Sequence, residues 1–180
     1  MRQMRMCIGA ALVCAMLLQC AAAGETYKQD GQGLAKEFEG FIKAYHKGDD
    51  EGMAEAFGIF RIPNEKEWFS EHFSKDDAGR LSAAYGQQVT DAMNALIEDM
   101  NSAGAGNKFG LHCEARGDVP AGTGKDEATR PVKAVRVEEF VMDFQALGTR
   151  AKFLVMANFV YVDGAYRFVG GGGGPFWRKM

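Results

Sequence analysis

The N-terminal half of the chain repeats apolar residues at the spacing of α-helices. Over residues 33–47 they recur every three or four positions, which predicts one amphipathic helix. Gly48 ends this pattern, and Asp49 or Asp50 follows as an N-cap for a short helix that reaches about Phe57. The first part of the chain is therefore expected to be helical.

Two further helices are expected before the pattern changes. Asn64, with Glu67 three residues later, is close to a capping box and starts a short helix. Ser74 starts a long one, in which an apolar stripe continues to about Asn101. Gly86 lies near its middle and is a candidate kink that would split it in two.

From residue 109 the apolar period becomes two, which predicts strands. Residues 109–116 alternate as a half-buried strand does, and a polar loop follows over 117–131. Residues 132–144 form the second expected strand. Its apolar parity changes at Glu138 and Glu139, which indicates a β-bulge there.

The last two strands are expected to form a hairpin. Residues 150–163 are apolar on both parities beyond Phe153, which is typical of a central strand. Asp163 and Gly164 make a two-residue turn, and residues 166–169 return. The fold class expected is α+β, with N-terminal helices, one of them long, packed on a bent antiparallel sheet of about four strands.

Composition agrees with one globular domain. The chain has 180 residues, of which 47% are hydrophobic and 25% charged, and its net charge is -3. These values exclude a disordered polymer and a polytopic membrane protein. The acidic balance argues against binding of nucleic acid through bulk charge.

The first 23 residues resemble a secretory signal peptide. Arg2 and Arg5 precede an apolar stretch over 6–18, and small residues up to Ala23 supply a cleavage site. Two alternatives are a lipid anchor on Cys20 and an uncleaved apolar anchor. All three place the folded part outside the cytoplasm, periplasmic or secreted. After cleavage at Ala23, no transmembrane helix is expected.

The domain boundaries follow from this assignment. A single domain spans 24–169, and a glycine-rich tail spans 170–180. Cys113 is the one cysteine left after cleavage, which excludes an intramolecular disulfide, and its alternating strand predicts a core residue. The glycine run is interpreted as a tether for the aromatic and basic residues Phe176 to Lys179, which either pack over the sheet or contact a partner.

The closing hairpin carries a family resemblance. An aromatic strand, Asp163-Gly164 and the aromatic-basic-aromatic strand from Tyr166 to Phe168 resemble a common ending in the nuclear transport factor 2-like superfamily. The layout of helices followed by a curved sheet is similar as well. The resemblance implies a cone with an apolar pocket, used by lipid carriers in one branch and by steroid isomerases and polyketide cyclases in another.

Candidate chemistry is sparse. His112 and Glu114 share one strand parity, and Asp143 lies within an apolar strand, so these are the candidate acid-base groups, with Tyr85 or Tyr161 as a partner. The parity of Asp143 is opposite to that of the apolar residues beside it, which favours an outward position. His46 and His72 are interpreted as surface or edge residues; no metal motif is present, and no cofactor is expected.

The leading hypothesis is a non-enzymatic exported domain that binds a small apolar molecule or lipid. The expected lining of its pocket is aromatic: Trp68, Phe69, Phe73, Tyr85, Phe140 and Phe144. The alternatives are an isomerase- or cyclase-like enzyme, and a protein-interaction module that acts through the aromatic-basic tail.

Overall fold

The computed structural model describes residues 26–119, 131–172 and 175–176. The expected signal segment, with Ala23 and Cys20, and the basic end of the tail lie outside these residues. The described elements are α1 (Gly31–Glu37), α2 (Glu39–Lys47), α3 (Asp50–Gly58), α4 (Glu65–His72), α5 (Lys75–Gly104), β1 (Phe109–Val119), β2 (Val137–Ala146), β3 (Lys152–Val162) and β4 (Ala165–Gly171).

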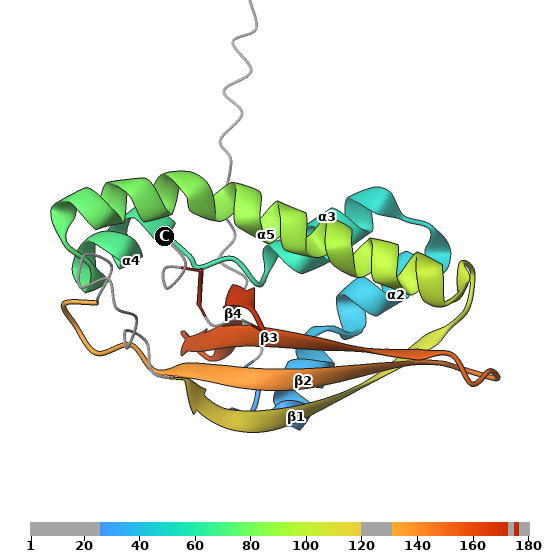
Figure 1. The fold of residues 1–180 in the computed structure, drawn as a ribbon. Coiled ribbons are helices and arrows are strands. Elements are labelled where there is room, and N and C mark those ends of the chain that lie inside the picture. Colours follow the sequence, from blue (N-terminus) through green and yellow to red (C-terminus); the bar gives the residue numbers. More distant parts are fainter. Residues whose placement is uncertain (1–25, 120–130, 173–174, 177–180) are drawn as a thin grey trace, which may run out of the picture.

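The four strands form an open antiparallel sheet in the order β1-β2-β3-β4. The long helix α5 crosses one face of this sheet, with α4 near one end and α2 and α3 near the other (Figure 1). The predicted α+β class is confirmed, and β3 is a central strand as expected.

Local capping explains where most helices begin. The Asp49 carboxylate accepts the Gly52 N–H at 2.9 Å and starts α3. Ser74 Oγ accepts the Asp77 N–H at 3.3 Å and starts α5. The capping box expected at Asn64 is not formed, because this residue adopts a left-handed backbone with φ 48° and makes no side-chain cap bond.

Two helix predictions need correction. The helix expected over 33–47 is two helices that meet at Phe38, whose buried ring stacks on Phe60 with a centroid distance of 4.1 Å. The kink expected at Gly86 does not divide α5, which is one element of 30 residues. The packing of the Phe38 ring explains why the first helix is divided. The second correction follows because α5 continues through Gly86 without a break.

The strands differ from expectation at their ends. β1 extends to Val119, and β2 begins at Val137 rather than at residue 132. The bulge lies on β1, where the register shifts between Ala115 and Gly117, and not within β2. The parity change in β2 arises because Val137 and Glu138 are both buried.

The predicted hairpin turn is present between β3 and β4. Asp163 (φ 52°) and Gly164 (φ 81°) both have positive φ, as a two-residue type I′ turn requires. β4 then continues to Gly171, so two glycines of the expected tail belong to the sheet. Further along, Phe176 packs against Tyr85 at a centroid distance of 5.5 Å.

Candidate functional site

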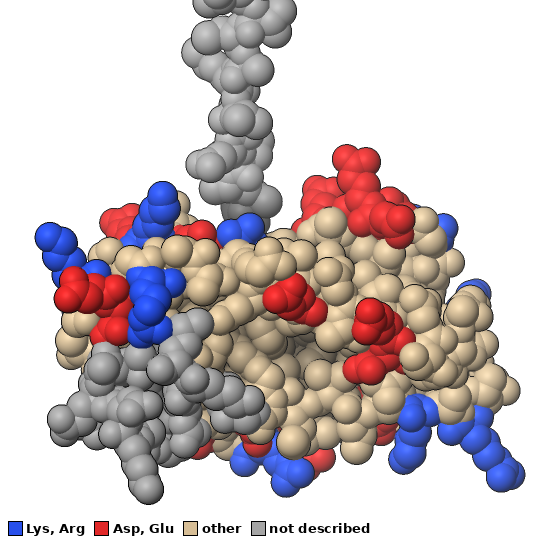
Figure 2. All heavy atoms as spheres, turned by 45° about the horizontal axis from the view of Figure 1, so that its top comes forward, with Lys and Arg blue, Asp and Glu red and all other residues tan. Residues whose placement is uncertain are grey.

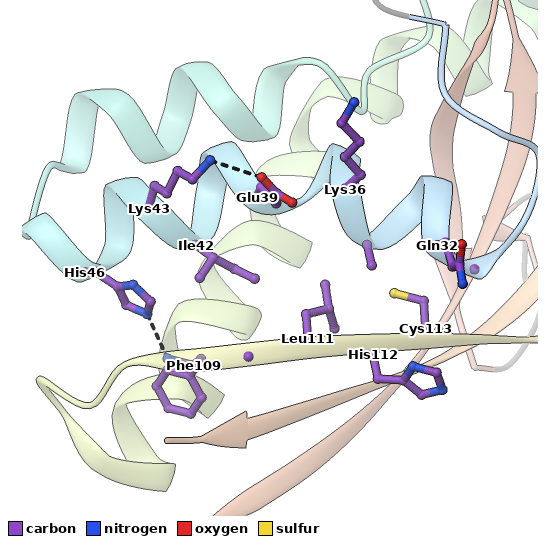
Figure 3. Close-up of a pocket in the computed structure, with 13 residues that line it drawn as sticks. Gln32, Lys36, Glu39, Ile42, Lys43, His46, Phe109, Leu111, His112 and Cys113 are labelled. Atoms are coloured by element: carbon purple, nitrogen blue, oxygen red, sulfur yellow. Dashed lines mark hydrogen bonds and ion pairs between the residues drawn. The ribbon is translucent and has the colours of Figure 1, made fainter. Parts of the chain in front are cut away.

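A groove of about 630 Å³ lies between the helix pair α1–α2 and the edge strand β1 (Figure 3). Helix α1 runs beside this strand because Gly31 has no side chain: a Cβ there would lie 2.0 Å from the Cys113 carbonyl oxygen. The groove is lined by Gly31, Gln32, Ala35, Lys36, Glu39, Ile42, Lys43, His46 and residues 109–113.

The floor of the groove is apolar. Ile42 points from α2 toward β1, and Leu111 points back from β1 toward the helices (Figure 3). Ala35 and the buried side chains of Phe109 and Cys113 complete this surface. The alternation of β1 produces the arrangement, since its odd-numbered residues turn their side chains to the helical side.

The rim of the groove is charged and carries more cations than anions. Lys43 Nζ forms an ion pair with Glu39 at 3.0 Å, and both side chains are exposed. Lys36 Nζ lies 5.9 Å from the centroid of the Tyr27 ring. Glu39 lies between the two lysines and neutralises Lys43, so the excess positive charge of the rim is that of Lys36, and an anionic group beside Lys36 would gain a favourable electrostatic interaction (Figure 3).

His46 closes one end of the groove. Its Nε2 accepts the Phe109 backbone N–H at 2.7 Å, so the ring is neutral and protonated at Nδ1 (Figure 3). Desolvation, and then the positive charge of Lys108, lower the pKa of His46. The expectation of a surface histidine is therefore incomplete: His46 is exposed but is the acceptor for an edge-strand amide.

Cys113 is a structural thiol. It is 5% exposed, and burial raises its pKa to about 12, which keeps it protonated at neutral pH. The prediction of a core cysteine is confirmed.

The aromatic residues expected to line a pocket lie outside this groove. Phe69, Phe73, Tyr85, Phe140 and Phe144 are each at most 2% exposed. Phe69 contacts the rings of Phe73 and Tyr85 at centroid distances of 5.8 and 5.5 Å. Phe140 packs on Phe159 and Tyr166, and Phe144 stacks on Phe153, so all five side chains fill the core.

The sixth residue of that set, Trp68, is partly buried. Its indole ring stacks on His72 at 4.3 Å. Both side chains line a separate depression of about 430 Å³ beside Tyr161.

The Tyr85 hydroxyl links three segments of the fold through hydrogen bonds. Its hydroxyl accepts the Ile62 N–H at 2.9 Å and donates to the Phe168 carbonyl oxygen at 2.9 Å. It thus joins α5 to the 60–62 segment and to β4. Desolvation raises the pKa of this phenol, so it stays protonated.

The candidate acid-base side chains lie on the face of the sheet that is turned away from the helices, although His112 is also among the residues that line the groove. His112 and Glu114 are exposed, and His112 is the cross-strand neighbour of Asp143. This face is turned away from the buried Tyr85, so the structure does not bring these residues together with that hydroxyl. Asp143 lies on the parity opposite to the buried Met142 and Phe144 and is half-buried. Its Oδ2 accepts a hydrogen bond from Gln145 at 3.1 Å, and its Oδ1 is buried without a hydrogen-bond partner among the described residues.

The sequence pattern did not identify the polar residues of the groove, because they lie on the polar side of the expected 33–47 helix. Lys36, Lys43 and His46 follow one another at helical spacing, which is equally typical of a solvated face. Only the position of β1 beside this helix makes their spacing meaningful.

Comparisons of the chain with known proteins do not assign it to a family. No protein-family model, curated protein or solved structure matches the chain. Within the described ranges, no helix combines the length and apolar character needed to cross a membrane. Those same ranges contain no group of three or more histidine, cysteine and acidic side chains placed to hold a metal ion.

On the side that carries α5, basic side chains lie mainly at the margin, with acidic ones among uncharged atoms (Figure 2).

Proposed function

We propose that this chain is a non-enzymatic binding domain that holds an apolar ligand with an acidic group in the groove between α1–α2 and β1. The observation that carries the proposal is the combination of an apolar floor at Ile42 and Leu111 with a rim bearing Lys36 and Lys43. Small-molecule sites commonly combine an apolar lining with a few polar groups at the edge. The proposal includes export of the domain.

Two observations favour binding over catalysis. The Cys113 thiol is protonated at neutral pH, and His112 and Asp143 lie on the face opposite Tyr85. A kinship with the nuclear transport factor 2-like superfamily is part of the proposal, on the strength of the closing hairpin. The ligand position differs from that of a central cone, because the aromatic side chains expected there fill the space themselves.

The test uses an aromatic sulfonate dye, 8-anilinonaphthalene-1-sulfonate, which combines apolar rings with one negative charge. Its fluorescence should rise on binding to the folded domain, and amide NMR signals of residues 109–113 should shift. Ala35→Trp fills the groove and should abolish both effects. Lys36→Glu reverses a rim charge and should weaken binding about fivefold.

The matched control is Lys47→Glu, which reverses a charge on the same helix pair outside the groove lining. It should bind the dye like the unmodified protein. Circular dichroism and thermal unfolding would establish that each variant is folded. Dye binding that persists in folded Ala35→Trp, or shifts confined to other residues, would refute the proposed site.

A further inference from the structure

The backbone of β1 presents unpaired hydrogen-bonding groups to the groove. In a strand, alternate residues direct N–H and C=O to opposite edges. The Lys108 C=O accepts the Leu147 N–H at 2.7 Å, so even-numbered residues face β2. The Phe109 N–H points the other way, to His46, so odd-numbered residues face the groove. Leu111 therefore directs both its N–H and its C=O outward.

The two edges of the sheet differ in how their outward backbone groups are hydrogen-bonded. On β4, the Tyr166 N–H is bonded to the Glu37 carboxylate and the Phe168 N–H to the Phe60 C=O. Nothing comparable covers Leu111: no described residue bonds to its outward N–H or C=O. An exposed edge of this kind is a template for another strand.

The open section of the edge has defined ends. At one end, His46 takes the Phe109 N–H. At the other, Gly31 of α1 lies against the Cys113 carbonyl oxygen. Between them, Leu111 is flanked by the outward Phe109 C=O and Cys113 N–H. At about 3.3 Å per residue this section is about 13 Å long, which matches an added strand of about five residues.

We propose that the ligand of the groove is an extended peptide that adds to the sheet beside β1 and exchanges backbone hydrogen bonds with Leu111. This inference rests on the proposed function, because it names the occupant of the same groove. A lipid chain has no donor and acceptor to pair with Leu111, whereas a peptide backbone supplies both. Alternate side chains of the peptide face the helix pair, where the apolar ones lie on Ile42, and the side chains between them point to the other face of the sheet.

The probe is a capped peptide of about five residues in which valine and glutamate alternate. On binding, hydrogen exchange of the Leu111 amide should slow at least about tenfold. Two N-methylated forms of the peptide then test the backbone contact without altering the protein. Methylation of the central residue and of its neighbour blocks N–H groups on opposite edges of the added strand.

One methylated isomer should lose at least about tenfold in affinity, while the other keeps most of it. Equal affinities of both isomers for the groove would overturn the proposal. The variant Leu111→Pro removes the outward donor and leaves the ladder to β2 intact, since this N–H does not face β2. Because the Leu111 side chain also forms the floor of the groove, this variant should weaken binding of the sulfonate dye as well, and only an additional loss of affinity for the peptide reports the backbone contact.

The outcomes separate this inference from the proposed function. If the dye binds in the groove but the peptide neither binds nor protects Leu111, strand addition is refuted and the groove stands as a site for small ligands. If neither ligand binds, both proposals fail. Protection of the Leu111 amide that depends on protein concentration without peptide would assign the edge to a second copy of the chain and refute the peptide.

Discussion

Glu37 gives the domain a pH dependence of stability whose sign is opposite to that of an ordinary carboxylate. It is 2% exposed at the end of α1, and its Oε2 accepts the Tyr166 N–H at 3.0 Å. Among the described residues its Oε1 has no hydrogen-bond partner. Desolvation therefore raises its pKa from 4.5 to about 7, although the Tyr166 N–H and the charge of Arg167 oppose the shift.

The sign follows from proton binding. Between the unfolded pKa of 4.5 and the folded pKa of about 7, the folded state holds more protons on Glu37 than the unfolded state. Its contribution to stability is present below pH 4.5 and is lost as pH rises through 7. Linkage gives a loss of about 2.5 kcal/mol between pH 5 and pH 8. For a domain of this size, that lowers Tm by about 5–10 °C.

The assay is chemical unfolding of Glu37→Gln and of the unmodified protein across this pH range. The amide stays neutral and keeps an acceptor for the Tyr166 N–H. We therefore expect the difference in free energy of unfolding, variant minus unmodified protein, to be about 2.5 kcal/mol larger at pH 8 than at pH 5. Glu98→Gln, at an exposed position in α5, is the matched control and should leave the profile unchanged. If Glu37→Gln leaves the profile unchanged, Glu37 does not cause the pH dependence of stability.

Three other measurements test the packing around the groove and the core. Tyr85→Phe leaves the Ile62 N–H and the Phe168 C=O without their hydrogen-bond partner and should lower the free energy of unfolding by about 1–3 kcal/mol. An unchanged free energy of unfolding would contradict this structural role of the hydroxyl. Gly31→Ala should destabilise by about 1–3 kcal/mol because its Cβ meets the Cys113 carbonyl oxygen, whereas Gly79→Ala, in open space on α5, should stabilise by about 0.5–1 kcal/mol. Acidification through the lowered pKa of His46 removes the acceptor of the Phe109 N–H, so the protection of this amide against hydrogen exchange should fall relative to its intrinsic exchange rate, which itself slows on acidification; unchanged protection would contradict the role of His46.

The parts of the fold that depend on local chemistry were predictable. Asp49 and Ser74 start helices through bonds to residues three positions away, and the Asp163-Gly164 turn needs only two residues with positive φ. The break at Phe38 was not predictable, because it depends on a ring contact with Phe60, which is distant in sequence.

The candidate site was harder to predict for the same reason. An aromatic residue at helical spacing faces either a cavity or another ring, and the sequence does not distinguish these. Phe69 and Tyr85 face other rings. The groove exists because Gly31 allows α1 to approach β1, a contact between residues that are distant in the chain. Helical spacing alone places Lys36 on a solvated face.

Amide NMR spectra of the labelled domain, recorded with increasing amounts of the valine–glutamate peptide, would show whether a peptide adds to β1. We expect saturable shifts along residues 109–113 and on α1–α2, with the Leu111 amide proton moving downfield as it gains an acceptor. Shifts centred instead on Trp68 and His72, or none in that section of β1 at saturating peptide, would contradict this expectation.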